Sequence, residues 1–80
     1  MRYTVLIADD SKLQRVIVKE NLKDIYDVAE ASGGQECLDL VEHSAGKIDA
    51  VLLDIVMPGM DGFEVLRRRQ ESGVFQKIPV

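Results

Sequence analysis

Two stretches decide the fold: VLIADD at residues 5–10 and AVLLDIVMPGMDG at residues 50–62. Each opens with a short run of continuous apolar residues, as expected of a strand covered on both faces, and each run ends in aspartate. If the two runs are neighbouring parallel strands, Asp9, Asp10 and Asp54 meet at one edge of the sheet. Because three like charges repel at short range, we expect a hard cation among them or a proton on one of them.

Strand-like and helix-like segments alternate along the chain, which is typical of a parallel sheet with crossover helices. The expected elements are strands at residues 3–8, 26–31 and 49–54 and helices at residues 12–23, 35–44 and 62–71. Residues 78–80, Ile-Pro-Val, have the composition of the opening of a fourth strand.

The first helix has a start signal and an apolar face. Ser11 and Gln14 have the spacing of a capping box. Leu13, Val16 and Ile17 follow at helical spacing, which predicts the apolar side of this helix, and Leu22 and Ile25 extend that side loosely toward the helix end.

The other two helices have shorter apolar patterns. Leu38 and Val41 have the core-facing spacing in the second helix. Phe63 and Leu66 are expected to point inward from the third, with Val65 beside them.

The strand order follows from polarity and handedness. The first and third strands are the most apolar and should be central neighbours, whereas the more polar second strand suits an edge. Right-handed crossovers then give the order 2-1-3. The winding reverses between strands one and three, and ligands bind in the crevice at such a reversal. Asp9, Asp10 and Asp54 are expected at that crevice.

Length and composition limit the function classes. Eighty residues allow one domain, residues 1–80. A formal net charge of -4 and a pI of about 4.8 argue against direct nucleic-acid binding. The start MRYTVLI is too short and interrupted for a secretory leader, and no stretch has the roughly 20 apolar residues of a membrane span. We therefore expect a cytoplasmic protein that does not contact membranes.

Four further features have structural interpretations. Cys37 has no second cysteine and is expected to be a small buried hydrophobe, and His43 a solvent-facing helical side chain. Asp61 has the position of a helix cap. The basic run at residues 67–69 favours a solvated face that complements the helix dipole over a docking patch for an acidic partner.

Taken together, ADD after the first strand, LLDIVMPGMDGFE after the third and IPV at the fourth have the spacing of a known family. The chain resembles the receiver domain of bacterial two-component response regulators over all 80 residues. This resemblance implies a flavodoxin-like, doubly wound parallel α/β fold. The chain would cover its N-terminal part, with strand order 2-1-3 and the start of strand four.

The resemblance also implies roles for individual residues. Asp54 matches the phosphoacceptor, and Asp10 and Asp54 match direct Mg²⁺ ligands. Asp9 resembles the acid that holds the ion through water, and Val56 the residue whose backbone carbonyl completes the shell. Such oxygen ligands suit Mg²⁺. The implied partner is a sensor histidine kinase or phosphotransfer protein, whose phosphohistidine supplies the phosphoryl group that regulates a downstream output. The domain would be no enzyme beyond its own phosphorylation and dephosphorylation.

The chain departs from the family pattern in one respect. The family's Ser or Thr at the end of strand four and its Lys at the end of strand five have no counterpart in the 80 residues. The apolar third strand would then have an uncovered, adhesive edge. We expect either that the sequence is part of a longer protein or that it self-associates through that edge.

Two alternatives remain open. The first is a receiver-shaped interaction module that is never phosphorylated, although such modules often lose one of the acids and all three are present here. The second is a metal-dependent phosphatase with an aspartyl nucleophile. That class would typically show a second Asp two residues after the first, where this chain has Val56.

Overall fold

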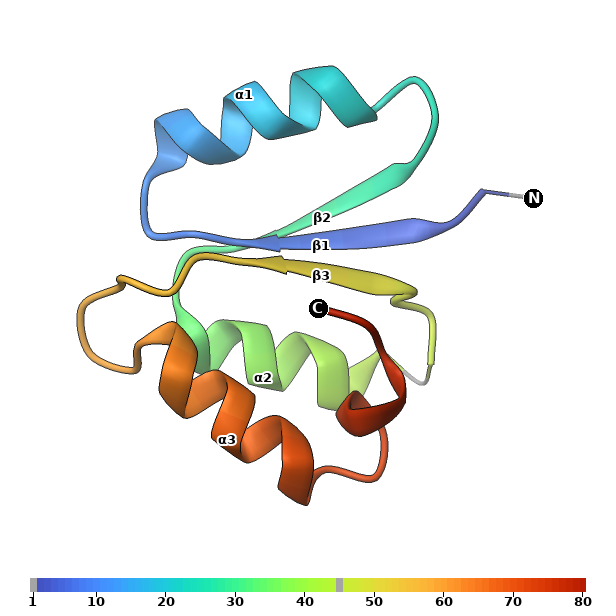
Figure 1. Ribbon diagram of the computed structural model, residues 1–80. Coiled ribbons are helices and arrows are strands. Elements are labelled where there is room, and N and C mark those ends of the chain that lie inside the picture. Colours follow the sequence, from blue (N-terminus) through green and yellow to red (C-terminus); the bar gives the residue numbers. More distant parts are fainter. Residues whose placement is uncertain (1, 45) are drawn as a thin grey trace.

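The computed structural model describes residues 2–44 and 46–80. Strands and helices alternate, and a short 3₁₀ helix follows the last of them (Figure 1). In chain order the elements are β1 (Thr4–Ala8), α1 (Lys12–Leu22), β2 (Asp27–Ala31), α2 (Gly34–His43), β3 (Ala50–Leu53), α3 (Gly62–Glu71) and η1 (Phe75–Lys77). The three strands and three helices expected before residue 72 are confirmed, with bounds that differ by at most one residue.

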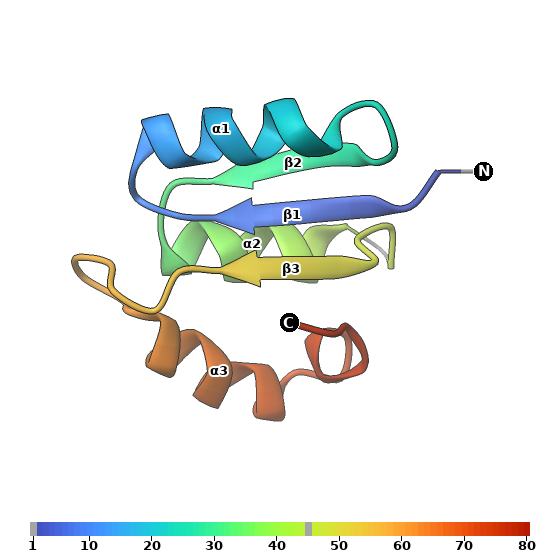
Figure 2. The ribbon, with the colours of Figure 1, turned by 45° about the horizontal axis from the view of Figure 1, so that its top comes forward.

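The strands form one parallel sheet in the predicted order, β2-β1-β3. Residues 4–8 of β1 pair with residues 27–31 of β2, and residues 5–8 pair with residues 50–53 of β3. All three arrows point the same way in Figure 2, so the carboxyl ends of the strands share one edge. The candidate site lies at that edge.

The two faces of the sheet have different covers. Helix α1 lies over one face, and α2, α3 and η1 lie over the other (Figures 1 and 2). The core forms on the α2–α3 side, and its largest fully buried side chains are Phe75, Leu6, Val41, Val51, Val65 and Cys37. Burial of an aliphatic or phenyl side chain of this size stabilises the fold by about 1.5–3 kcal/mol.

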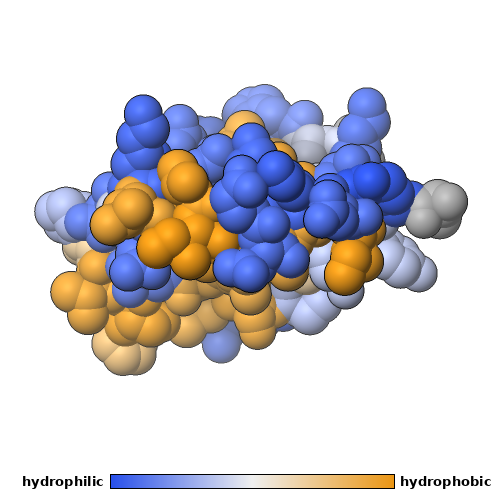
Figure 3. Space-filling view, turned by 90° about the horizontal axis from the view of Figure 1, so that it is seen from above, coloured by the Kyte–Doolittle hydropathy of each residue, from blue (hydrophilic) through white to orange (hydrophobic). Residues whose placement is uncertain are grey.

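Helix α1 differs from its prediction in the side that it turns inward. It has no buried residue, and Leu13, Val16 and Ile17 are 67%, 43% and 46% exposed. Of the other two residues expected on this face, Ile25 is 65% exposed and Leu22 is half-buried. The half-buried positions are Ser11 at the cap and, along the helix, Arg15, Val18 and Leu22, which have the spacing i, i+3, i+7. Figure 3 looks down on this side and shows apolar surface gathered beside hydrophilic surface. The expected apolar face of α1 is therefore mostly a surface feature.

Helix α2 supplies the largest helical share of the core. Cys37, Leu38 and Val41 are buried, as predicted, and His43 is exposed with Nδ1 2.7 Å from the carbonyl oxygen of Asp39. Burial raises the pKa of the Cys37 thiol to about 11, so this side chain behaves as a small hydrophobe. The turn after α2 uses Gly46 at φ 77°, a conformation that favours glycine.

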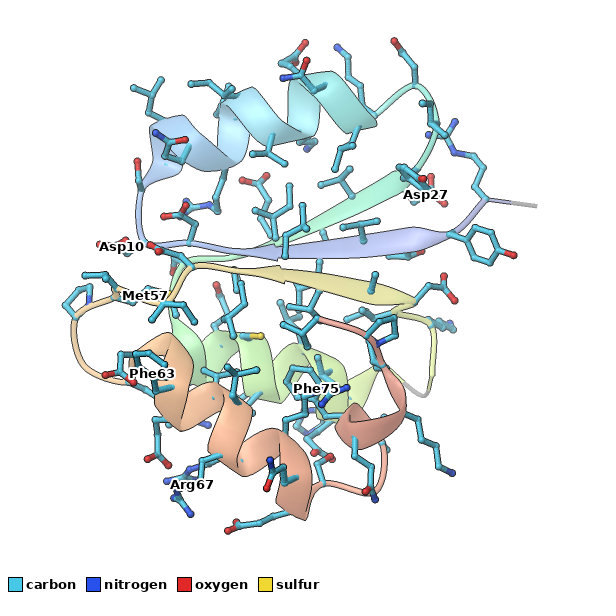
Figure 4. All side chains as sticks on the ribbon, viewed as in Figure 1. Asp10, Asp27, Met57, Phe63, Arg67 and Phe75 are labelled. Carbon is cyan, nitrogen blue, oxygen red and sulfur yellow. The ribbon has the colours of Figure 1, made fainter. Side chains whose placement is uncertain are left out.

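Helix α3 has the predicted bounds and cap, but Phe63 was placed on the wrong side. Asp61 Oδ1 accepts a hydrogen bond of 2.9 Å from the Glu64 N–H, the usual N-cap contact. Val65 is fully buried and Leu66 half-buried, whereas Phe63 is 68% exposed (Figure 4). Because Gly62 lies against the backbone at Asp54 and Ile55, it sets the rotation of the helix and turns Val65 inward.

The arginine run divides into two roles. Arg67 and Arg68 bind Glu64 on their own helix, and these hydrogen bonds lower the pKa of the Glu64 carboxyl from 4.5 to about 2. Arg69 instead donates to the carbonyl oxygen of Ile78 at 2.8 Å, and its guanidinium lies 5.9 Å from the centroid of the Phe75 ring. The run is therefore not a uniform solvated face, since Arg69 holds the last residues of the chain against the rest of the domain.

The last residues continue the sheet without forming a regular strand. Phe75 and Ile78 are buried on the α2–α3 side, and the Val51 N–H of β3 donates to the carbonyl oxygen of Pro79 at 3.0 Å. Residues 78–80 thus lie next to β3, where the fourth strand was expected.

None of the helices within residues 2–44 and 46–80 is long and apolar enough to cross a membrane.

Candidate functional site

The structure brings the three predicted acids together at the carboxyl edge of the sheet. Asp9 and Asp10 follow β1 directly and Asp54 follows β3, and one carboxylate oxygen from each lies within 4.8 Å of the others. In the part of the chain that the structure describes, this is the one cluster of three or more side chains of metal-ligand type. Asp10 is exposed at this edge (Figure 4), and Asp9 and Asp54 are half-buried.

Backbone contacts hold Asp54 in place. Its N–H donates to the carbonyl oxygen of Ala8 at 2.9 Å, which continues the β1–β3 pairing to the last residue before the loop. One carboxylate oxygen, Oδ1, accepts a hydrogen bond of 3.2 Å from the Val56 N–H. The side chain is therefore oriented by its own loop, while its half-buried position leaves it accessible from solvent.

Asp9 is held on both its backbone and its side chain. Its N–H donates to the carbonyl oxygen of Ala31 at 3.0 Å, and its Oδ1 accepts from the Ser11 N–H at 2.9 Å. The predicted capping box is therefore half formed. Ser11 Oγ accepts from the Gln14 N–H at 3.3 Å, but the Ser11 N–H is bound by Asp9.

The loop after Asp54 is locked by close backbone packing. Gly59 follows Pro58 and has φ 75°, a conformation that glycine adopts without strain. The Gly62 N–H donates to the carbonyl oxygen of Ile55 at 2.8 Å, and a Cβ on Gly62 would lie 2.6 Å from both the Asp54 carbonyl oxygen and the Ile55 Cα. Only glycine permits this approach, so the start of α3 fixes the residue that follows β3.

Val56 lies two residues after Asp54 at the rim of the site. Its side chain is 81% exposed, and its backbone N–H is bound to Asp54. The role expected for its carbonyl oxygen as a metal ligand stays a prediction.

Comparisons with known proteins agree with this geometry. Residues 5–80 match the family described as response regulator receiver domain. The chain belongs to this family. It is 36% identical over 74 residues to the response regulator MprA of Mycolicibacterium vanbaalenii, covering 91% of this chain and 31% of that protein. It is 34% identical over 79 residues to the sensor histidine kinase CheAY of Helicobacter pylori, covering 98% of this chain and 10% of that protein.

Solved receiver structures resemble this one closely. The N-terminal domain of a response regulator receiver protein from Methanoculleus marisnigri JR1 is 38% identical, with a TM-score of 0.88 over 98% of this chain and 63% of that one. The chain thus spans less than two thirds of these relatives.

This receiver domain also contains a polar contact beside the acids that the sequence did not reveal. Arg15, on α1, donates from Nη1 to the carbonyl oxygen of Asp9 at 2.6 Å and from Nε to Glu30 Oε1 at 3.1 Å. The signal for it was the spacing of Arg15 with Val18 and Leu22, which marks the inward stripe of α1. Because the stripe on the outer side of α1 is more apolar, the sequence pattern favoured that side as the buried one.

Proposed function

We propose that the domain accepts a phosphoryl group on Asp54 in a Mg²⁺-dependent reaction. The donor would be the phosphohistidine of a sensor histidine kinase or phosphotransfer protein in the cytoplasm, and the phosphorylated domain would regulate a downstream output. The observation that supports this most directly is the cluster of Asp9, Asp10 and Asp54, whose carboxylate oxygens lie within 4.8 Å of one another. Family membership supports the same assignment.

The donor set fits Mg²⁺. Two oxygens that each lie about 2.1 Å from one ion are at most about 4.2 Å apart, and a ligand that acts through water can lie farther away, so oxygens within 4.8 Å of one another suit two direct acids and one that acts through water. Asp10 and Asp54 would contribute carboxylate oxygens and Val56 its carbonyl oxygen as direct ligands, and Asp9 would hold the ion through water. Bound there, the ion would supply positive charge against the phosphoryl oxygens.

The transfer step mainly requires that the protein hold a nucleophile, the Asp54 carboxylate, in position. An Asp54 carboxylate oxygen forms the new O–P bond, while the P–N bond of the phosphohistidine breaks and its electron pair stays on the imidazole nitrogen. Since the Val56 N–H binds Oδ1, Oδ2 is the oxygen with the freer approach. The phosphoryl group would carry about two negative charges where the free carboxylate carries one, and this change would alter the balance of forces in the β3–α3 loop, which is how phosphorylation can act as a signal.

The test is phosphoryl uptake from a small donor. The chain is incubated with Mg²⁺ and acetyl phosphate, and intact mass is followed; beryllium fluoride serves as a stable phosphoryl mimic detected by NMR. We expect uptake at Asp54 that stops in Asp54→Asn and requires Mg²⁺. Asp61→Asn is the matched control, because Asn also caps helices and the same loop keeps its shape.

Two results would contradict the proposal. The first is unchanged uptake by Asp54→Asn. The second is no response of the Asp54 amide signal to Mg²⁺ or to beryllium fluoride. A longer chain that also contains the family's Ser or Thr and Lys, and that shows neither response, would instead act as an unphosphorylated interaction module.

A further inference from the structure

Arg15 is a half-buried cation next to an acidic site. Its side chain is 13% exposed, although α1 otherwise buries little. The guanidinium lies between the carboxyl ends of β1 and β2, where it binds the carbonyl oxygen of Asp9 and the carboxylate of Glu30. Ordering a long side chain in this way costs conformational entropy, which the contacts of the guanidinium must offset.

The contact fixes a peptide plane. The Asp9 carbonyl and the Asp10 N–H belong to one planar peptide unit, so a hydrogen bond on the first restricts the rotation of the second. The peptide on the other side of Asp9 is held too, because the Asp9 N–H donates to Ala31. Both peptide units that flank Asp9 are therefore tied to β2 or α1. The direction in which the Asp10 side chain leaves the backbone depends on the second of these units.

The charge of Arg15 is compensated. Glu30 Oε1 lies 3.1 Å from Nε, and Glu30 Oε2 also lies 3.7 Å from Lys19 Nζ. A cation beside a magnesium site would weaken the site if its charge were free. With Glu30 as its ion-pair partner, Arg15 can hold the Asp9–Asp10 turn at a smaller electrostatic cost.

We propose that Arg15 is a positioning residue for the acid cluster. Through the Asp9 carbonyl it orients the Asp9–Asp10 turn so that both carboxylates face Asp54, and Glu30 holds the guanidinium in place. This inference rests on the proposed function of the cluster. It assigns no contact between Arg15 and the phosphoryl group.

Charge and position predict opposite results for the loss of Arg15. Removal of a nearby positive charge alone would tighten Mg²⁺ binding. Loss of a positioning contact would weaken Mg²⁺ binding. For groups that hydrogen-bond to metal ligands without touching the metal, such a loss is typically about 10- to 100-fold in affinity. The sign of the change therefore separates the two accounts, and general destabilisation does not mimic it in the folded population.

The experiment is a Mg²⁺ titration of the chain followed by backbone amide NMR signals. Affinity is read from the signals of the folded state, so that partial unfolding lowers their intensity but not the dissociation constant. The variants are Arg15→Gln, which removes the fork and the charge, and Arg15→Lys, which keeps the charge but cannot donate from two nitrogens of one rigid plane. Lys19→Gln is the matched control, since Lys19 pairs with the same Glu30.

We expect Arg15→Gln to weaken Mg²⁺ binding by about 10-fold or more, Arg15→Lys to restore only part of it, and Lys19→Gln to stay within about threefold of the wild type. In the metal-free protein, the Asp10 amide signal should move in both Arg15 variants and stay in place in Lys19→Gln. Equal or tighter binding by Arg15→Gln would overturn the inference and leave the proposed function intact. If the wild-type chain bound no Mg²⁺, the proposed function would fail. The metal-free Asp10 signal would still decide whether Arg15 orients the turn.

Discussion

The two helical layers hold the two halves of the acid cluster by different means. On the α2–α3 side, Gly62 presses against the backbone next to Asp54, and Val65 and Phe75 are fully buried. On the α1 side no helical residue is buried, and the Asp9–Asp10 turn is held by hydrogen bonds instead. Close packing thus anchors one half of the site, and polar contacts anchor the other. Packing tolerates changes of volume poorly, whereas hydrogen-bonded turns depend on particular donors.

Gly62→Ala should give the largest effect on stability, because Gly62 lies in the half of the site that close packing holds. The new Cβ would meet two backbone atoms at 2.6 Å, and neither can move without shifting the loop. We expect a loss of about 2–3 kcal/mol in the free energy of unfolding, measured by urea denaturation.

Gly73→Ala is the control for Gly62→Ala, since a Cβ there meets no heavy atom within 4 Å. Its effect should stay within about 0.5 kcal/mol. Equal effects of the two substitutions would show that the close approach at Gly62 does not hold the loop.

The same substitution in each layer sharpens the comparison. Val65→Ala, at a fully buried position on α3, should cost about 1–3 kcal/mol of unfolding free energy for the methyl groups lost. Val16→Ala, at a position on α1 that is 43% exposed, should change stability by less than about 0.5 kcal/mol, since alanine is also the better helix former. Thermal or urea unfolding of both variants measures the difference. A larger cost for Val16→Ala would contradict the unequal packing of the layers.

The smallest effect concerns the surface charges of α3. Arg67 and Arg68 lower the pKa of the Glu64 carboxyl to about 2, so its ionised form favours the folded state. This contribution is present above the ordinary pKa of 4.5 and is lost as the pH falls from there toward 2. We expect a small difference in urea midpoint between the wild type and Glu64→Gln at neutral pH that disappears at the acidic end. If the difference in urea midpoint persisted at the lowest pH, its cause would not be the ionisation of Glu64.

The order of the strands and the meeting of the acids could be predicted from the sequence because both follow from simple rules. Two apolar runs with a polar one between them, joined by right-handed crossovers, leave one arrangement, and parallel strands end at one edge. Asp9, Asp10 and Asp54 then come together, however the helices are turned.

The rotation of the helices could not be predicted with the same rules. Helix α1 has apolar residues on two stripes, at Leu13, Val16 and Ile17 and at Val18 and Leu22, so periodicity allows two faces. The partial burial of Val18 and Leu22 and the contact of Arg15 with the ends of β1 and β2 show which stripe faces the sheet.

Phe63 was misplaced for a related reason. Burial of a phenyl ring is favourable in itself, but the backbone approach at Gly62 sets the turn of α3 and leaves that ring outside.

The exposure of Asp10 has a consequence for access to the site. Since this carboxylate lies at the surface, the proposed Mg²⁺ ion and phosphodonor would reach the cluster by diffusion through solvent, and none of the described residues would have to move first. Occupancy of the proposed metal site would then follow the Mg²⁺ concentration of the surrounding solution.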